Sequence, residues 1–450
     1  MSEANSRLIQ ISANQMFDWA TELFPLNRSL TGEGVRQTLD YIKSKIPKLE
    51  IKQVKSGKKA FDWTIPKEWH ISDGFITDST GVKLVDWKEN NLHVMGYSTP
   101  INTTLTFEEL EKHLFTLPSQ PDAVPYVTSY YEPNWGFCIS ENQKQKFKNS
   151  PFTVVINSKL FDGYMNYGEL IIPGLSPKTV LLSANICHPS LANNEVSGPV
   201  VLTALCKYLQ DTGPNYYTYR ILFIPETIGS IYYLSKHIKQ LKRNLVAGWT
   251  ITCVGDDGQF SYIPTRRGST LTDRVSILIL KNFSQGYKEY SWLDRGSDER
   301  QFNSPGIDLP VASITRSKYG EYAEYHTSLD NLEFISGEGL YGSLEIYKHC
   351  IQVLEQNLIY TPSVLCEPKL GKYKLYETVS IKGRALSSRK ILNVLSFIDG
   401  DTDLIGISGK TGLKFEEIVE ITKTLESHRI IHNNRLSNKR RKQKSNVKQR

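Results

Sequence analysis

The chain has 450 residues, which predicts roughly two to three domains at about 150 residues each. Its hydrophobic content of 39% and charged content of 22% are typical of a water-soluble globular protein, and no run approaches the roughly 18 apolar residues of a membrane-spanning helix. The net charge of +7 comes from the C-terminal end of the chain, because nine basic residues and no acidic one follow Glu426. The remaining 45 basic and 47 acidic residues give the bulk of the protein no electrostatic reason to bind nucleic acid.

The two ends of the chain and its cysteines indicate the cellular compartment. Residues 1–6 contain no basic segment that leads into an apolar one, so we expect no secretory signal and a cytoplasmic protein. The six cysteines have no CxxC spacing, which favours free thiols over disulfides. The basic tail, residues 437–450, is predicted to be disordered and solubilising, with contact to an anionic membrane, nucleic acid or glycan as the alternative.

A first helix is expected from Ile9 to Phe24, followed by a turn rich in glycine and hydroxyl groups. Ser29 or Thr31 is expected to cap the helix that follows this turn. Arg28 lies in the same turn, and an arginine in such a turn before a helix is suited to hold an anion. Arg28 is therefore a candidate substrate-binding residue, with a plain surface arginine as the alternative.

Residues 51–150 differ in character and predict a small β-rich domain inserted into an α/β domain. Short β-like segments alternate with turns, and Thr106 and Glu109 have the spacing of a capping box. Aromatic residues are dense at the end of this region and form either one wall of a substrate cleft or a local core: Tyr126, Tyr130, Tyr131, Trp135 and Phe137. Tyr131 is the candidate substrate-binding residue among them.

From residue 151 the pattern predicts strands that alternate with helices. Strands are expected at 152–157, 167–172, 179–184, 219–224 and 246–254, with helices at 199–210 and from about 231. Three of these strands end in loops that carry charged or imidazole side chains: His188 and Glu195, then Glu226, then Asp256 and Asp257. A parallel sheet gathers such strand ends at one edge, where ligands bind.

These side chains have the chemistry of a hydrolytic zinc site. Carboxylate and histidine ligands hold the metal, which lowers the pKa of a bound water, and an unligated glutamate such as Glu226 takes the proton. His326 lies in a polar loop, where a packing role is less expected than on an apolar helix face. The alternative is four unrelated capped loops.

The same loops carry a family resemblance over nearly the whole chain to about residue 430. They resemble the aminopeptidase-like proteins often associated with bacterial surface-polysaccharide biosynthesis, in CHPSLAN at 187–193, SG at 197–198, PETIGS at 225–230, GDD at 255–257, GSDER at 296–300, YHTSLD at 325–330, and FDW at 61–63 with HVMGYSTP at 93–100 in the insert. That family is similar in turn to the zinc exopeptidases of the aminopeptidase/glutaminyl-cyclase clan. The resemblance implies a phosphorylase/hydrolase-like α/β/α sandwich with a mixed sheet, an inserted β-rich domain and a C-terminal winged helix.

Carried over position by position, the resemblance implies roles for the site residues. His188 matches the first metal ligand, Glu226 the general base, Asp256 or Asp257 a carboxylate ligand, and His326 the last histidine ligand. We take Asp298, Arg300 and Tyr325, which lie within the shared motifs, as candidates for substrate binding.

Two positions depart from the zinc aminopeptidases. Asn194 stands where those enzymes place a metal-bridging Asp, and Thr227 stands where they place a second metal-binding Glu. We therefore expect one zinc, held by His188, by Glu195 or an Asp, and by His326, because three protein ligands and a water suffice for a catalytic zinc. A site that has lost its metal is the alternative.

Residues 374–436 are interpreted as a separate module, which leaves 1–50 with 151–373 as the discontinuous aminopeptidase-like domain. Three short helices predict a winged helix-turn-helix, as the family implies. Its third helix carries four acidic residues, Glu416, Glu417, Glu420 and Glu426, and is a poor surface for DNA. Protein contact or formation of a homo-oligomer is favoured.

Three functions are considered for the whole chain. A zinc-dependent peptidase or amidase, acting on a small peptide-like or amino-acyl sugar substrate, is favoured. A non-catalytic ligand-binding protein on the same fold and a regulator that acts through the C-terminal module are the alternatives.

Overall fold

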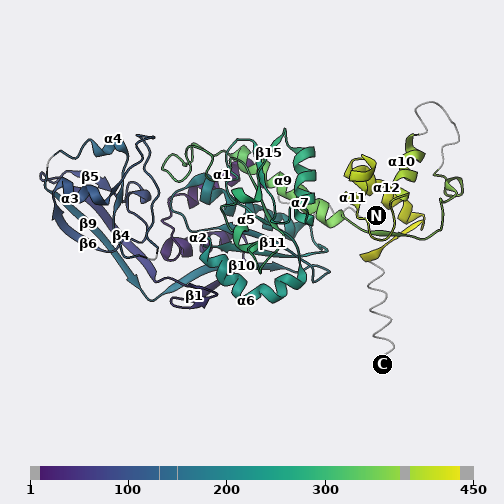
Figure 1. Ribbon diagram of the computed structural model, residues 1–450, viewed down its shortest axis with the longest axis horizontal. Coiled ribbons are helices and arrows are strands. Elements are labelled where there is room, and N and C mark those ends of the chain that lie inside the picture. The colour runs from purple at the N-terminus through teal and green to yellow at the C-terminus, as the bar shows by residue number, and fades with distance from the viewer. Residues whose placement is uncertain (1–10, 131, 149, 376–385, 436–450) are drawn as a thin grey trace, which may run out of the picture. The chain divides into compact units, whose positions relative to one another are not determined.

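The computed structural model describes residues 11–130, 132–148, 150–375 and 386–435 (Figure 1). The chain divides into two compact units, residues 1–348 and 349–450. Tyr131 and the basic tail, 437–450, lie outside the described residues. Among the helices that are described, none has the length and apolar character needed to cross a membrane.

The first unit is built on an eight-stranded mixed sheet. Its four central strands run parallel to one another, and antiparallel pairings join the neighbouring strands on either side. In spatial order the strands are β1 (Glu50–Lys55), β10 (Tyr164–Ile172), β12 (Thr218–Ile224), β11 (Thr179–Asn185), β13 (Leu245–Thr250), β16 (Val311–Thr315), β14 (Phe260–Ile263) and β15 (Tyr287–Glu289).

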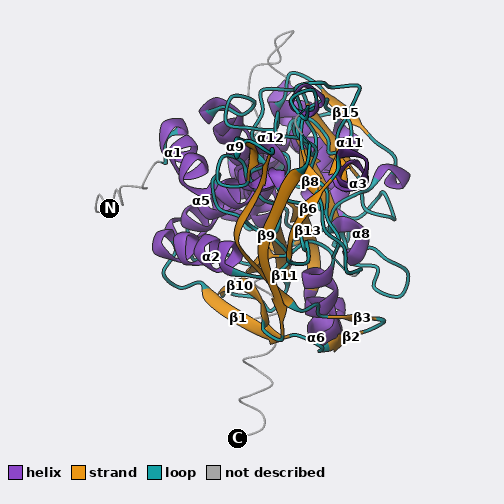
Figure 2. Ribbon diagram, turned by 90° about the vertical axis from the view of Figure 1, so that its left-hand side faces the viewer, coloured by secondary structure: helices purple, strands orange, loops and turns teal. Residues whose placement is uncertain are grey.

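Helices cover both faces of this sheet. Every residue of β11 is buried, as expected of a strand whose two faces are both covered. Helices α1, α2 and α5 lie on one side of the sheet and α6 and α8 on the other (Figure 2). The helices are α1 (Ala13–Leu23), α2 (Glu33–Lys45), α5 (Ser197–Asp211), α6 (Ile228–Asn244), α7 (Leu271–Phe283), α8 (Glu299–Phe302) and α9 (Gly337–Gln356). The predicted α/β/α sandwich with a mixed sheet is confirmed.

A separate four-stranded antiparallel sheet lies in the region of the predicted insert. Its order is β5 (Lys83–Asp86), β4 (Glu68–Thr77), β9 (Phe152–Phe161) and β6 (Ile101–Leu105). The strand expected at 152–157 thus belongs to this sheet, whereas residues 51–54, assigned to the insert, lie in β1 of the main sheet. Short elements complete the region: β2 (Lys59–Ala60), β3 (Trp63–Thr64), α3 (Phe107–Leu110), β7 (Leu114–Phe115), β8 (Phe137–Cys138) and α4 (Glu141–Lys144).

Of two helix starts that were predicted, the structure confirms one and corrects the other. Helix α3 begins with the predicted capping box, in which Thr106 and Glu109 satisfy each other's backbone N–H groups. Helix α2 instead begins after Gly32, with no side-chain cap. Ser29 and Thr31 do not cap it, because the hydroxyl of Ser29 donates to the Thr31 carbonyl and that of Thr31 bonds to Tyr97.

The second unit contains three helices and a two-stranded sheet. The helices are α10 (Leu386–Leu395), α11 (Leu404–Thr411) and α12 (Phe415–Ser427), and the strands are β17 (Tyr360–Pro362) and β18 (Ile431–Asn433). Three helices followed by a β-strand are the elements of the predicted winged helix.

Candidate active site

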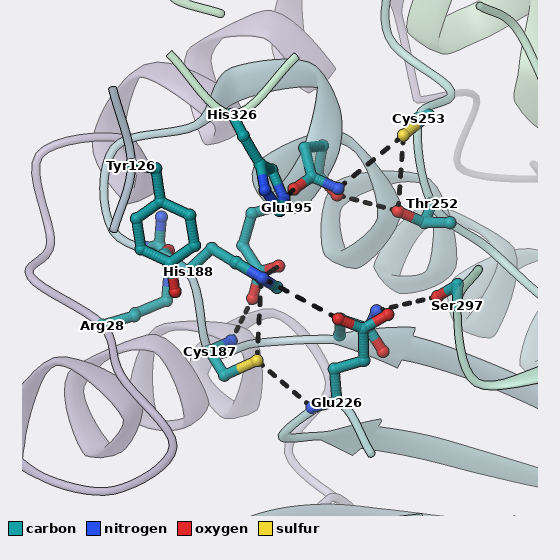
Figure 3. Close-up of polar contacts among 12 residues, drawn as sticks. Arg28, Tyr126, Cys187, His188, Glu195, Glu226, Thr252, Cys253, Ser297 and His326 are labelled. Atoms are coloured by element: carbon teal, nitrogen blue, oxygen red, sulfur yellow. Dashed lines mark hydrogen bonds and ion pairs between the residues drawn. The ribbon is translucent and has the colours of Figure 1, made fainter. Parts of the chain in front are cut away.

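The candidate site lies at the carboxyl ends of the parallel neighbours β11 and β12. His188 follows β11 by three residues, and Glu226 follows β12 after Pro225. The two side chains meet there, with 3.8 Å between Nε2 of His188 and Oε2 of Glu226 (Figure 3). They line a pocket of about 240 Å³ together with Leu30, Trp63, Tyr130, Cys187, Thr227, Ile228 and Arg300. The sequence therefore predicted correctly that these two strand ends converge.

Glu195 fixes the orientation of the His188 ring. The two side chains lie 2.6 Å apart at Oε2 and Nδ1, and the other carboxylate oxygen of Glu195 accepts a hydrogen bond from the backbone N–H of Cys187. Glu195 is 1% exposed, so both of its oxygens are used within the protein. We expected Glu195 or an aspartate to be a metal ligand. In the structure its carboxylate bonds to Nδ1 of His188, the position of a carboxylate that orients a metal-binding histidine and leaves Nε2 facing the pocket.

The short loop that carries Glu195 is held from two directions. Residues Ala192–Val196 form a single π-helical turn before α5. The carboxylate of Asp330 accepts hydrogen bonds from the backbone N–H groups of Asn193 and Asn194, at 2.6 and 3.0 Å. Gly198 allows α5 to approach the backbone just after β13, because a Cβ atom there would lie 2.3 Å from the carbonyl oxygen of Ile251. The turn is therefore rigidly placed beside β11.

Arg28 contacts this loop from within the protein rather than from the pocket. Its side chain is 2% exposed, and its Nε donates to the carbonyl oxygen of His188 at 2.9 Å. Burial lowers its pKa to about 10, although the charge of Glu195 opposes this shift. Arg28 was expected to bind substrate or lie on the surface, and it does neither: it is a buried cation that positions His188.

His326 brings a second imidazole to the site. Its ring centroid lies 5.4 Å from that of His188, and its Nε2 lies 3.0 Å from Oδ1 of Asn194. Tyr325 stacks on the His326 ring at a centroid distance of 3.9 Å, which holds the ring in place. Burial, followed by the charge of His188, lowers the pKa of His326 to about 3, so the imidazole is neutral at pH 7.

Glu226 has the surroundings of a proton acceptor. Its backbone N–H points at Cys187 Sγ at 3.2 Å, and the Ser297 side chain nearby favours the charged form of the carboxylate. Its side chain keeps 21% of its surface exposed, so the pocket reaches it. Burial raises the pKa of Glu226, against the opposing charges of His188 and Arg300, and a raised carboxylate pKa suits a general base near neutral pH.

Thr227 sits in a strained turn directly after Glu226. Its φ of 64° and ψ of −76°, with a hydrogen bond from Ile228 N–H to the Glu226 carbonyl, define a γ-turn of the rare, strained kind. Such a conformation costs about 1–3 kcal/mol and persists only where neighbours enforce it. Asp298 accepts from the Thr227 N–H at 2.8 Å, and Arg300 donates to the Thr227 hydroxyl at 2.6 Å. Asp298 is thus a buried support of the turn, whereas Arg300 lines the pocket.

Asp256 and Asp257 do not join the site, contrary to their expected role as ligands. Asp256 is buried, and its carboxylate accepts hydrogen bonds from the Asn193 amide, the Gly258 N–H and both the N–H and hydroxyl of Ser317. Asp257 is exposed and accepts from the hydroxyl of Ser336. Both aspartates stabilise loops.

A different donor set comes together beside His188. Within the part of the chain that the structure describes, one group of three potential metal donors has its ligand atoms within 4.8 Å of one another: Cys187, His188 and Glu195. Cys187 was not predicted as a donor, and the neighbouring His188 was the one signal for it in the sequence. Burial raises the pKa of the Cys187 thiol to about 12, so the free thiol is protonated at pH 7.

Two family models and a relative match the chain. The family model of a domain of unknown function, DUF4910, matches residues 17–357, and a winged helix-turn-helix model matches residues 358–433. A protein of Clostridium acetobutylicum named as a candidate polysaccharide biosynthesis protein with an aminopeptidase-like domain is 42% identical over 423 residues, which cover 93% of this chain and 96% of the relative.

Solved structures support the same assignment. The crystal structure of a candidate peptidase from Clostridium acetobutylicum has a TM-score of 0.87 at 41% identity and covers 94% of this chain and 96% of its own. A zinc aminopeptidase from Bacillus subtilis shares the fold, with a TM-score of 0.56 at 14% identity, over 77% of this chain and 96% of its own. The chain therefore belongs to the DUF4910 family and is an aminopeptidase-like protein with a C-terminal winged helix.

Proposed function

We propose that this protein is a zinc-dependent hydrolase that cleaves a peptide or amide bond. The observation that carries the proposal is the carboxylate of Glu226, which lies 3.8 Å from His188 Nε2 in a pocket of about 240 Å³. A candidate general base, Glu226, and a candidate metal ligand, His188, therefore line the same pocket.

The donor set fits one zinc ion and argues against two. His188 is oriented by a carboxylate at its other ring nitrogen, as metal-binding histidines are, and His326 supplies a neutral imidazole nearby. The amide oxygen of Asn194 lies beside Nε2 of His326 and would be the third protein donor. A second ion would need anionic ligands where Asn194 and Thr227 stand, and the Thr227 hydroxyl is already engaged by Arg300.

In the proposed reaction, each protein group has a separate task. A zinc ion held by His188 and His326 would supply Lewis acidity to a carbonyl oxygen and to the attacking water. Glu226 would accept the proton that this water loses as its oxygen bonds to the carbonyl carbon. The same carboxyl group would then give the proton to the leaving nitrogen as the carbon–nitrogen bond breaks, which regenerates the base. Glu195 and Arg28 hold His188 in place throughout.

The substrate is proposed to be a small peptide-like or amino-acyl sugar compound. A link to surface-polysaccharide or amino-sugar metabolism rests on the name of the Clostridium relative. The pocket volume is on the scale of a single residue or sugar unit and is below that of pockets for drug-sized ligands.

The C-terminal module is proposed to contact protein, including a second copy of this chain, rather than DNA. Glu416 and Glu420 are exposed on α12, so the helix that would enter a DNA groove presents negative charge to phosphate.

The experiment that tests the hydrolase combines metal exchange with substrate screening. Protein stripped with a chelator, and the same protein reloaded with zinc, would be assayed against aminoacyl and N-acyl amides with a chromogenic leaving group. We expect turnover by the reloaded protein and its loss on stripping. Turnover that is indifferent to zinc, or none by zinc-loaded protein on any amide, would overturn the proposal and favour a non-catalytic binding protein.

A further inference from the structure

We propose that the pocket binds a ligand through an anionic group, with a carboxylate as the group that Arg300 recognises. The inference rests on the proposed function and narrows it: of the peptide-like and amino-acyl compounds considered, it selects peptide-like amides that carry a carboxylate rather than a free ammonium group.

The first observation is the state of the Arg300 guanidinium. It donates one hydrogen bond, to the Thr227 hydroxyl at 2.6 Å, although a guanidinium has five N–H donors. Its Nε is buried and has no hydrogen-bond partner. Among the residues that the structure describes, no carboxylate pairs with Arg300 within 4.0 Å. The charge of Arg300 acts on the nearby carboxylates of Glu226 and Asp298, but neither pairs with it directly, so most of its N–H donors remain for a ligand.

The second observation is that the nearby carboxylates are already used. Asp298 accepts from the Thr227 N–H and from the Ser230 hydroxyl at 2.8 Å each, so it supports the turn. Glu226 faces His188, with 3.8 Å between its Oε2 and the Nε2 of His188. Neither carboxylate forms a direct ion pair with Arg300, so the remaining N–H donors of Arg300 are left for a ligand in the pocket that it lines.

The third observation is the character of the pocket wall. Leu30 and Ile228 are buried apolar residues, and Trp63 and Tyr130 add two aromatic rings. An apolar or ring-shaped body packs against such a wall while a planar carboxylate meets the planar guanidinium. A free ammonium group would instead meet like charge at Arg300, which disfavours it.

Binding measurements that do not depend on turnover test the inference. Calorimetry on the full-length protein would compare 4-methylpentanoate, 4-methylpentan-1-ol and 4-methylpentylamine, which share an apolar body and differ in the head group. We expect the carboxylate to bind at least about tenfold more tightly than the alcohol and the amine. Inorganic phosphate is then added as a competitor. Displacement of 4-methylpentanoate by phosphate would show a general oxyanion site, whereas no displacement would show the carboxylate-selective site that we propose.

Variants of Arg300 identify the group responsible. Arg300→Gln should remove most of the preference for the carboxylate, whereas Arg300→Lys, which keeps the charge but not the fork of donors, should still favour the carboxylate over the amine. Arg295→Gln is the matched control, because Arg295 lies in the same loop but is exposed and bonds to Trp292. Circular dichroism would verify that each variant is folded.

The outcomes distinguish this inference from the hydrolase proposal. Equal binding of all three compounds, or a preference that survives in Arg300→Gln, would overturn the anionic substrate class. If the preference depends on Arg300 but neither zinc nor amide hydrolysis is found, the hydrolase proposal fails and the anion-binding pocket stands.

Discussion

The loops that follow β11 and β13 leave the same edge of the sheet, yet they use their charged side chains in different ways. The first directs His188 into the pocket, where Nε2 meets the carboxylate of Glu226 at 3.8 Å. The second directs Asp256 back into its own loop, where four hydrogen bonds use both carboxylate oxygens. A place at the carboxyl edge of a parallel sheet is thus necessary for a site but not sufficient. A side chain at this edge faces the pocket only if neighbouring donors do not already occupy its hydrogen-bond acceptors.

The two loops are also connected. Asn193, in the first loop, donates from its side chain to Asp256 at 2.8 Å and accepts from the N–H of Gly255. Asn193 precedes Asn194 and Glu195, which flank the two histidines. Asp256 therefore supports the site through Asn193 without touching it.

The largest effect is expected at the base. Glu226→Gln should lower kcat for amide hydrolysis by about 10²- to 10⁴-fold, because the neutral amide cannot accept a proton. The matched control is Asp257→Asn, in the second loop, which removes an exposed carboxylate that bonds to Ser336 and should leave kcat unchanged. Full activity in Glu226→Gln would remove Glu226 from the mechanism.

Asp298 should make stability depend on pH. Burial, followed by the charge of Glu226, raises its pKa to about 7, whereas an unfolded Asp titrates near 3.9. The folded state therefore holds more protons between about pH 4 and pH 7, and this group's contribution to the free energy of unfolding falls as pH rises through that window, by at most about 4 kcal/mol.

Urea denaturation from pH 4 to pH 8 measures this dependence. In Asp298→Asn the side-chain oxygen can still accept from Thr227 and Ser230, and the corresponding fall should disappear. An unchanged pH profile in the variant would contradict the buried, proton-holding carboxyl group.

Asp256 should matter for stability and not for metal binding. Asp256→Asn replaces one acceptor oxygen by a donor that faces other donors, and we expect it to lower the free energy of unfolding by about 3 kcal/mol. Zinc content of the folded variant should equal that of the wild type. Loss of zinc in a variant that is otherwise stable would show that Asp256 is a ligand after all.

Substitution of Glu195 should reduce zinc affinity without abolishing it. Glu195→Gln keeps the size of the side chain but weakens its hold on His188 Nδ1, and the loss of such an orienting carboxylate lowers metal affinity by about 10- to 100-fold. Competition with a chelator of known affinity measures the change. Complete loss of zinc would favour direct ligation by Glu195, and no change would exclude the orienting role.

The sequence predicted the sheet edge well, and the reasons are local. The apolar runs at 179–184 and 219–224 define buried strands, and parallel pairing then places His188 near Glu226. Prediction from the sequence failed where strand pairing or helix capping depends on residues far away in the chain. The strand at 152–161 shows no local sign that it pairs with β4 rather than with the main sheet. The Thr31 hydroxyl forms hydrogen bonds with the Tyr97 hydroxyl and with the backbone N–H of Trp69, so it does not cap α2.

The roles of charged residues were harder to predict than their positions. Glu195 and Arg28 were both named as candidate site residues, but their tasks follow from contacts across the fold, to His188 Nδ1 and to the His188 carbonyl. The γ-turn at Thr227 depends on Asp298 and Arg300, which lie about 70 residues further along the chain. No local pattern of residues encodes these partners.

The most direct test of the central claim is the zinc content of the purified protein by elemental analysis, in wild type, His326→Ala and Asp256→Asn. The account predicts about one zinc per chain in the wild type, loss in His326→Ala and retention in Asp256→Asn. Two zinc ions per chain, none even after zinc is added back, or loss in Asp256→Asn with retention in His326→Ala would contradict it.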